Sequence, residues 1–248
     1  MLAASDVALP LRALPVLFVD CQSTGATPAH GALLEVAWAR NDEPVTSVLV
    51  ALPEGATIPP YVRRITGLGE SDLAAGEAPA DVWRALAREA RRVARAAGLA
   101  RAPAVIHFAS FELRFLLDLH EKHGDGGFPL DALCTHEIAR RLLPDLPRRG
   151  LRTLAGYFGA DAGELRRSAH HVEATRAVWR AMSALLEERG VRTLEELRAW
   201  TDRTEVARPL ARGWPMPASE RAGLPDARAS TACGGWTARS STWARPLR

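Results

Sequence analysis

Residues 16–40 read VLFVDCQSTGATPAHGALLEVAWAR, and the expected fold is built around this stretch. An apolar run, Val16–Val19, ends at a single carboxylate, Asp20. A polar turn containing Gly25 follows, and a second apolar run returns over Leu33–Ala39. This order predicts a β-hairpin whose first strand is buried and brings Asp20 to the sheet edge. A carboxylate at such a turn can hold a metal ion, or it can serve the turn itself, because Asp and Gly favour turns on backbone grounds.

The composition limits the class of protein. A chain of 248 residues, 47% hydrophobic and 25% charged, can form one sizeable α/β core with a small appendage. No apolar run approaches the roughly 20 residues of a membrane helix, and no basic-then-apolar signal pattern opens the chain. We therefore expect a cytoplasmic protein that has no membrane partner. The three cysteines show no paired spacing for a disulfide framework or a zinc site.

The cations are almost all Arg, with Lys122 the only Lys, and the net charge is +3. Arg binds phosphate in a bidentate way, which would suit nucleic acid. A GC-rich coding sequence explains the same bias, because Arg codons are GC-rich and Lys codons are not.

Apolar periodicity and the positions of Gly and Pro predict the remaining elements. A third strand is expected at Val45–Leu52, an irregular loop at Pro53–Arg63, and later strands at Ala104–Phe108 and Pro129–Leu133. Helices are expected at Val82–Leu99, Glu112–His120, Thr135–Leu143, Leu151–Tyr157, Glu173–Glu188 and Thr193–Trp200. Strands followed by helices after one leading hairpin are typical of a mixed sheet flanked by helices.

The hairpin resembles the first motif of the DnaQ-like (DEDD) 3′-5′ exonucleases, which have the RNase H-like fold. That family has hydrophobic-Asp-x-Glu-Thr-Thr-Gly and, after a gap, Ile-Leu-Glu-Ile-Ala. Asp20, Thr24, Gly25 and the return Leu34–Ala37 match this pattern, whereas Gln22 stands at the family's second carboxylate.

Further matches follow in the family's order. Ile65–Leu68 resembles its Ile-Thr-Gly-Ile turn, Ala104–Leu116 its His-Asn-Ala-x-Phe-Asp motif, and Leu151–Gly159 the helix before its third motif. The similarity extends from about residue 14 to residue 183. It implies an α/β, RNase H-like mixed sheet with a leading β-hairpin, flanked by helices.

The resemblance also implies a chemistry. The family uses four acids to hold two divalent ions, Mg²⁺ or Mn²⁺, at the scissile phosphodiester, and a general-base His to take the proton of the attacking water. Carried over by position, Asp20 keeps the first acid and Glu112 stands at the second motif's Asp. The third motif, aligned on Glu173-Ala174-Thr175, places His171 at the acid and Arg166 at the base. A shift of two residues would instead make Glu173 the acid and Ser168 the base.

The resemblance therefore implies Asp20, Glu112 and His171 as catalytic residues, with Gln22 joining them as metal ligands. Hard divalent ions prefer oxygen ligands, and Arg cannot act as a base at neutral pH. Because Asp20 and Glu112 together offset only one divalent ion, we expect metal binding to be weak if it occurs at all.

By the same resemblance, nucleic acid, as a single strand or a 3′ end, is expected to contact Thr24, Gly25, Thr66, Gly67, His107 and Phe111. The expected function is a DnaQ-like 3′-5′ exonuclease domain acting in DNA repair or processing, with a partly degenerate metal site. The alternative is a catalytically inactive module that binds nucleic acid or docks a partner in the same cleft. A third possibility, a hydrolase with Cys21 as its nucleophile, lacks an assignable His-Asp pair.

The domain boundaries follow from these assignments. We expect the exonuclease-like domain at residues 14–188, a helical extension at 189–208, and a linker with a disordered tail at 209–248. Gly223–Ala227 resembles the opening of a UvrC-type GIY-YIG nuclease domain, and one choice of synonymous codons lets residues 228–248 continue that domain in a shifted reading frame. We therefore expect a frameshifted or truncated form of a fusion between the two nucleases. This hypothesis requires that the genomic DNA downstream encodes the rest of a GIY-YIG domain in an open reading frame.

Overall fold

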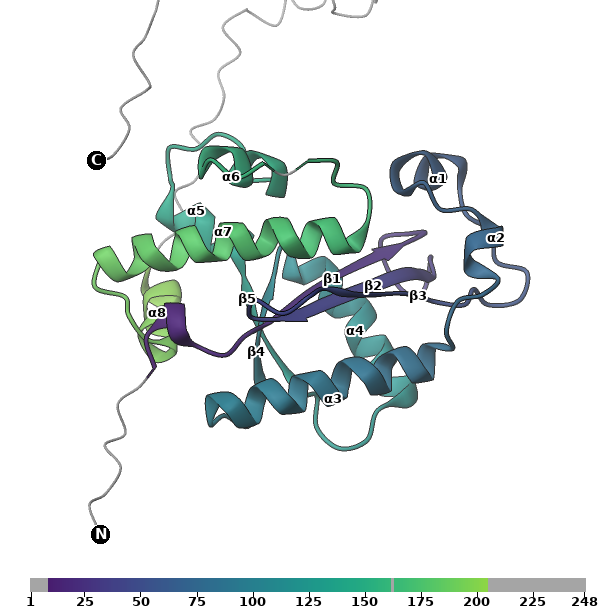
Figure 1. Cartoon of the computed structure of the whole chain (residues 1–248), viewed down its shortest axis with the longest axis horizontal. Helices are drawn as coiled ribbons and strands as arrows, with labels where there is room; N and C mark the ends of the chain where they lie inside the picture. Colours follow the sequence, from purple (N-terminus) through teal and green to yellow (C-terminus); the bar gives the residue numbers. More distant parts are fainter. Residues whose placement is uncertain (1–8, 162, 205–248) are drawn as a thin grey trace, which may run out of the picture. The chain divides into compact units, whose positions relative to one another are not determined.

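The computed structural model describes residues 9–161 and 163–204, which form a five-stranded mixed sheet of order β3-β2-β1-β4-β5 (Figure 1). β1 (Leu17–Ser23) pairs antiparallel with β2 (Leu33–Arg40), which pairs antiparallel with β3 (Thr46–Leu49). β4 (Ala102–Ile106) runs parallel to β1, and β5 (Leu130–Cys134) runs parallel to β4. The predicted mixed sheet with a leading hairpin is confirmed.

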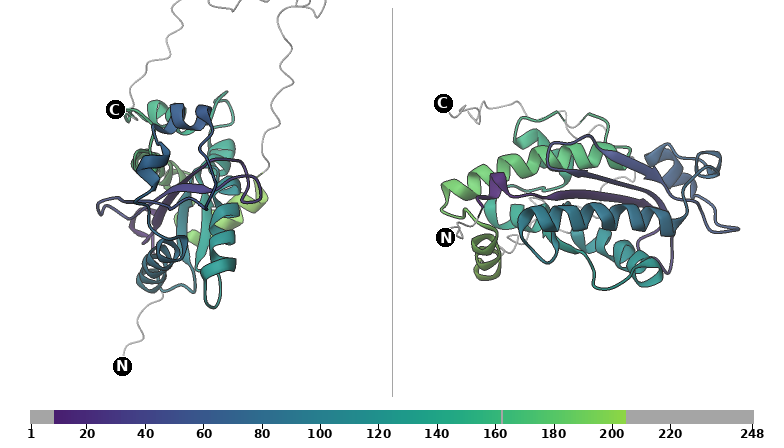
Figure 2. Two further views of the ribbon diagram at one scale, coloured as in Figure 1. Left: turned by 90° about the vertical axis from the view of Figure 1, so that its right-hand side faces the viewer. Right: turned by 60° about the horizontal axis from the view of Figure 1, so that its bottom comes forward.

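Helices cover both faces of the sheet (Figures 1 and 2). The bounds are α1 (Pro60–Thr66), α2 (Glu70–Leu73), α3 (Pro79–Ala97), α4 (Ala109–His123), α5 (Thr135–Leu142), α6 (Leu151–Tyr157), α7 (Ser168–Glu188) and α8 (Leu194–Arg203). Side chains of α5, α6, α7 and α8 pack in one core, on one face of the sheet. Side chains of α3 and α4 pack in a second core, on the other face.

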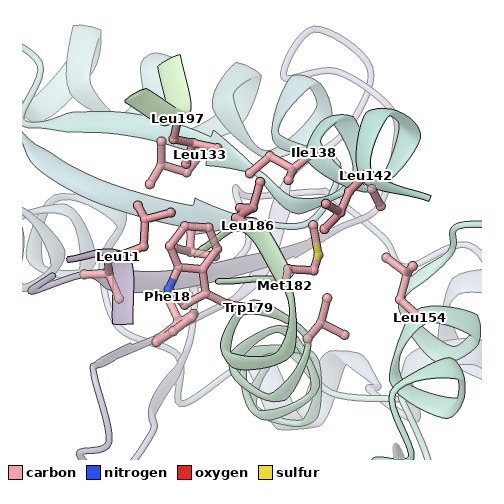
Figure 3. Close-up of a cluster of buried hydrophobic side chains, with 14 of the residues drawn as sticks. Leu11, Phe18, Leu133, Ile138, Leu142, Leu154, Trp179, Met182, Leu186 and Leu197 are labelled. Carbon is pink, nitrogen blue, oxygen red and sulfur yellow. The ribbon is translucent and has the colours of Figure 1, made fainter. Parts of the chain in front are cut away.

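The first core is centred on α7 (Figure 3). Trp179, Met182 and Leu186 recur at helical spacing and pack with Phe18 of β1. Each such side chain, when fully buried, contributes about 1.5–3 kcal/mol. These contacts hold α7 along the central strand and fix the position of its N-terminal turn.

β1 is buried on both faces, which explains its continuous apolar run. Phe18 belongs to the α7 core, whereas Leu17 and Val19 belong to the core of α3 and α4. Because successive strand residues point to opposite faces, Asp20 points toward α7 and Cys21 toward α4. Two neighbouring residues of one strand therefore reach helices on opposite faces of the sheet.

The structure corrects the expected placement of Asp20. β1 lies in the middle of the sheet and continues to Ser23, so Asp20 is inside the central strand, away from the sheet edge and the turn. The ladder pairs Asp20 with Ala37 of β2 and becomes irregular only between Gln22 and Ser23. Backbone pairing with β2 thus extends the strand past the polar residues.

Several helix bounds differ from expectation, and the differences at α1 and α7 bear on the site. α1 begins inside the expected loop, where Pro60 occupies a first-turn position that tolerates proline well. α7 begins at Ser168, ahead of the expected start at Glu173, and so takes His170 and His171 into its first turns.

Within residues 9–161 and 163–204, no helix is long and apolar enough to cross a membrane. The expected linker and out-of-frame tail, residues 209–248, lie outside the described residues. α8 lies within the expected extension 189–208 and buries Leu194 and Leu197 in the α7 core.

Candidate functional site

The candidate site lies where the carboxyl ends of the parallel strands β1 and β4 meet the N-terminal turns of α4 and α7. A hollow of about 450 Å³ opens there. It is lined by Asp20, Cys21, His107, Phe108, Ser110, Phe111, Glu112, Leu151 and His171. The residues predicted to be catalytic, Asp20, Glu112 and His171, therefore line one hollow, although they come from three separate elements.

A second hollow of about 330 Å³ shares Cys21, Phe111 and His171 with the first. Its other lining residues come from the end of β1, the following loop and α1: Gln22, Ser23, Gly25, Ala26, Tyr61, Val62, Ile65 and Thr66. We call the two hollows together the cleft.

Asp20 is paired with His171 inside the cleft. Nδ1 of His171 lies 3.1 Å from Oδ1 of Asp20, and Nε2 of His171 lies 3.3 Å from the carbonyl oxygen of Leu165. Burial lowers the pKa of His171, but the hydrogen bond and negative charge of Asp20 outweigh it and raise the pKa. Burial raises the pKa of Asp20, and His171 offsets part of that rise. Asp20 and His171 therefore interact directly and shift each other's pKa.

The same contact distinguishes the two registers of the third motif. His171 faces Asp20, whereas the side chain of Glu173 is 55% exposed and pairs with Arg176. Arg166, which would stand at the general base, is exposed and pairs with Glu164. The geometry therefore favours the register that places His171 at the motif's acid.

Glu112 and Gln22 contribute oxygen atoms without protein partners. Burial, and after it the charge of Asp20, raise the pKa of Glu112 well above its ordinary value. Nε2 of Gln22 donates to the carbonyl oxygen of Arg166 at 2.6 Å. Oε2 of Glu112, Oε1 of Gln22 and Oδ2 of Asp20 are buried and accept no hydrogen bond from any described residue.

His107 is held as a neutral ring. Its Nδ1 lies 2.9 Å from Oγ1 of Thr135, and burial, together with the charges of His136 and His171, lowers its pKa to about 3. At neutral pH it therefore presents an uncharged ring to the cleft.

One partly buried ion pair beside the cleft was missed by sequence analysis. Glu35 of β2 is 1% exposed and accepts hydrogen bonds from Arg167 Nη2 at 2.8 Å and Nε at 3.0 Å. It also accepts the backbone N–H of Ser168 at 3.0 Å and the hydroxyl of Ser47. Burial raises the pKa of Glu35, but these donors and the charge of Arg167 lower it overall. The signal in the sequence was that Glu35 is the one charged residue within the apolar run Leu33–Ala39.

Three of the residues predicted to bind nucleic acid help to close their own loops. Oγ1 of Thr24 accepts the N–H of Ala32, and a Cβ on Gly25 would lie 2.3 Å from the carbonyl oxygen of His30. The Thr66 hydroxyl donates to the Val62 carbonyl and accepts the Leu68 N–H. These contacts stabilise the chain around the cleft whether or not a ligand binds.

The six predicted nucleic-acid contacts divide by position. Gly25, Thr66 and Phe111 line the second hollow, and His107 and Phe111 line the first. Thr24 and Gly67 line neither; Gly67 ends α1 in the left-handed conformation, with φ 75°.

The donor set does not fit two divalent ions. Among residues 9–161 and 163–204, no three or more His, Cys, Asp or Glu side chains are placed to hold a metal ion. Asp20 is already paired with His171, Glu35 with Arg167, and Gln22 carries no charge. Glu112 is left as a carboxyl group whose burial favours the protonated form.

Comparison with solved structures identifies the fold. E. coli exonuclease I in complex with a dT13 oligonucleotide matches with a TM-score of 0.59 and 15% identity, over 75% of this chain and 45% of that one. Exonuclease X in complex with 5′ overhanging duplex DNA matches with a TM-score of 0.53 and 20% identity, over 75% of this chain and 99% of that one. A zinc-bound complex of E. coli exonuclease I with single-stranded DNA matches with a TM-score of 0.54 and 18% identity, over 71% and 41%.

The chain has the RNase H-like fold of the DnaQ-like exonucleases, as predicted, and the match spans less than half of the exonuclease I chain. No protein-family model and no curated protein sequence matches it.

Proposed function

We propose that this chain binds the 3′ end of a single-stranded nucleic acid in the cleft, in DNA repair or processing, on an exonuclease fold whose metal site is partly degenerate. The observation that carries the proposal is an apolar cleft on a fold shared with exonucleases solved with DNA, in which two of the expected metal ligands, Asp20 and His171, are paired with each other.

Exposed apolar side chains at the cleft support a stacking mode of binding. Tyr61 and Ile65 on α1 are 53% and 58% exposed, and Phe108 before α4 is 43% exposed. Large apolar groups left facing water beside a hollow indicate a binding surface. Aromatic faces bind unpaired bases of any sequence, because every base has a π-face.

Exposed arginines on the segments that border the cleft can supply the complementary charge. Arg64 lies on α1 next to Ile65, Arg114 lies on α4 with its Nη1 3.5 Å from the Ala26 carbonyl, and Arg148 precedes α6. All three are exposed, and none forms an ion pair with any residue in the described ranges. Such groups can contact the phosphates on either side of a stacked base.

Metal-dependent 3′-5′ hydrolysis is the second candidate. The unpartnered oxygens of Asp20, Gln22 and Glu112 favour it, because buried oxygen atoms without hydrogen bonds are suitable ligands for one hard cation. With Gln22 and His171 replacing two acids, this activity would be weak.

One experiment separates the two candidates. The purified chain is mixed with 5′-labelled single-stranded DNA, single-stranded RNA and blunt duplex, with Mn²⁺ in one series and EDTA in the other. We expect binding of single strands that persists in EDTA and weakens steeply with salt. Stepwise 3′ shortening that needs Mn²⁺ and is abolished by Asp20→Ala would instead support hydrolysis. Absence of binding to every nucleic acid would overturn both candidates.

A matched pair of variants tests the location. Ile65→Glu adds a negative charge at the cleft, and Leu99→Glu adds the same charge beyond the end of α3, on an exposed side chain that lines neither hollow. We expect Ile65→Glu to weaken binding about tenfold or more and Leu99→Glu to leave it unchanged.

A further inference from the structure

Phe108 has a backbone conformation that is unusual for an aromatic residue. Its φ and ψ are 59° and 47°, in the left-handed region, immediately before α4. Among the described residues, Asn41 is the other non-glycine residue with positive φ, and Asn adopts this region readily. In Phe the same conformation is strained by about 1–2 kcal/mol.

Core packing does not account for this strain, because the ring of Phe108 is 43% exposed. It lies against the ring of His136, with centroids 4.1 Å apart and planes inclined by 28°. The buried ring of His107 meets it edge-on at 4.7 Å. Two neighbouring rings therefore orient an aromatic face that remains accessible to solvent.

The location of this pair links it to the cleft. Phe108 follows β4 and lines the same hollow as Asp20 and Glu112, and His136 lies in the first turn of α5, just after β5. Phe108 occupies the position of Asn in the His-Asn-Ala-x-Phe-Asp motif, so here a residue suited to the left-handed conformation is replaced by one that is not. Strain of this kind is typical of functional positions.

The pair is also uncharged near neutral pH. Burial lowers the pKa of His136, and the nearby Arg140 and Arg149 act in the same direction, whereas Glu137 opposes them. A neutral stacked pair suits a nucleobase better than a phosphate.

We propose that the ring of Phe108, backed by His136, is the stacking surface for the last base of a single-stranded end that enters the cleft. The inference rests on the proposed function and adds the residue that holds the terminal base. Each stacked base contributes enough that its loss weakens binding about 5- to 150-fold.

The test uses Phe108→Asn, which removes the ring but keeps a residue that tolerates the left-handed conformation, and Phe108→Trp, which keeps an aromatic face. The probe is single-stranded DNA with 2-aminopurine as its 3′-terminal base, and anisotropy of an end label gives the affinity. We expect wild-type protein and Phe108→Trp to quench the fluorescence, and Phe108→Asn to lose the quenching and bind 5- to 150-fold more weakly. An abasic terminal nucleotide should weaken wild-type binding by a similar factor and leave Phe108→Asn almost unaffected.

The outcomes distinguish this inference from the proposed function. If wild-type protein binds the probe and Phe108→Asn binds equally well, or if only internal 2-aminopurine is quenched, the stacking role is overturned while the function stands. If wild-type protein binds no probe, both the stacking role of Phe108 and the proposed function are overturned. Thermal melting checks folding, and we expect Phe108→Asn to melt at or above the wild-type temperature because it relieves backbone strain.

Discussion

His171 places an imidazole beside Asp20, at the position where the resemblance to the exonucleases implies an acid. Replacing a carboxylate by an imidazole removes a negative charge, and the distance of 3.1 Å from Nδ1 of His171 to Oδ1 of Asp20 gives the remaining acid a partner within the protein. The negative potential that would attract a divalent ion is thereby reduced inside the protein itself. A cleft with little net charge and apolar walls is suited to a base or sugar more than to a hydrated cation.

Restoring the missing acids should restore metal binding. We expect the double variant Gln22→Glu, His171→Asp to be stabilised by millimolar Mn²⁺, with a melting temperature raised by about 3 °C or more, because ligand binding to the native state stabilises it. Wild-type protein should shift much less. Calorimetric titration with Mn²⁺ measures the affinity independently of any activity.

His170→Asp, combined with Gln22→Glu, is the matched control for that variant. It makes the same substitution one residue earlier in α7, on an exposed side chain that lines neither hollow. We expect it to respond less to Mn²⁺ than the first double variant. Equal responses of the two double variants would show that position 171 does not point to the metal site.

Two buried glutamates should give the stability of the protein opposite pH dependences. The pKa of Glu112 is raised, mainly by burial, so the folded state binds its proton more tightly and wild-type stability falls as pH rises from about 4.5 toward the folded pKa. The pKa of Glu35 is lowered by its donors, so its contribution is present above about 4.5 and is lost as pH falls through the folded pKa.

Urea unfolding of Glu112→Gln and Glu35→Gln measures both effects, with the Glu112 effect read above about pH 4.5 and the Glu35 effect read below it, so the series runs from about pH 2.5 to pH 8. Relative to wild type, Glu112→Gln should gain stability as pH rises, by up to about 1.4 kcal/mol per pH unit, and Glu35→Gln should lose stability as pH rises. Parallel pH curves for the two variants would contradict the assigned directions.

At the level of elements, α7 is attached to the sheet in two ways. Trp179, Met182 and Leu186 pack along β1, and the Arg167–Glu35 pair fastens the N-terminal end of the helix to β2. Because His171 is one turn beyond Ser168, that pair also determines where His171 meets Asp20. The buried acid of β2 thus positions the site without lining it.

Arg167→Ala should therefore lower the free energy of unfolding. It leaves Glu35 buried without its cation, and we expect a loss of about 1–3 kcal/mol, less than for a fully buried pair because Arg167 is partly exposed. Arg180→Ala is the control on the same helix, because the Arg180–Asp42 pair is exposed and should contribute less than about 1 kcal/mol. Denaturant unfolding gives both values, and similar losses would contradict the anchoring role.

The sequence predicts the secondary-structure elements well, but it predicts poorly the contacts between residues that are distant in sequence. The hairpin and the later strands and helices were predictable because apolar periodicity and Gly or Pro positions are local signals. The continuation of β1 to Ser23 and the extra turn at the start of α7 depend on pairing with β2 and on Glu35, which is distant in sequence. The stacking of Phe108 on His136 joins residues from two different strand ends, and no local pattern encodes it.

At the scale of the whole molecule, residues of the expected extension after residue 188 pack into the same core as the preceding domain. Val191, Leu194 and Leu197 are buried in the α7 core, and the backbone N–H of Leu11 donates to the carbonyl of Arg192 at 2.7 Å. The segment after α7 therefore closes the core beside the first described turn of the chain, Leu11–Ala13.

Two truncations test this boundary. A chain ending at residue 188 exposes the hydrophobic surface that Leu194 and Leu197 cover, and we expect it to lose about 3 kcal/mol or more, since each buried leucine removed costs about 2–5 kcal/mol. A chain ending at residue 208 keeps these contacts, and we expect its melting temperature to stay within about 2 °C of the full chain. Its affinity for single-stranded DNA should also be unchanged, because the cleft residues all precede residue 172. A stable, DNA-binding chain that ends at residue 188 would contradict a structural role for α8. A large loss of stability or affinity on removing residues 209–248 would give those residues a role that the proposed shifted reading frame does not explain.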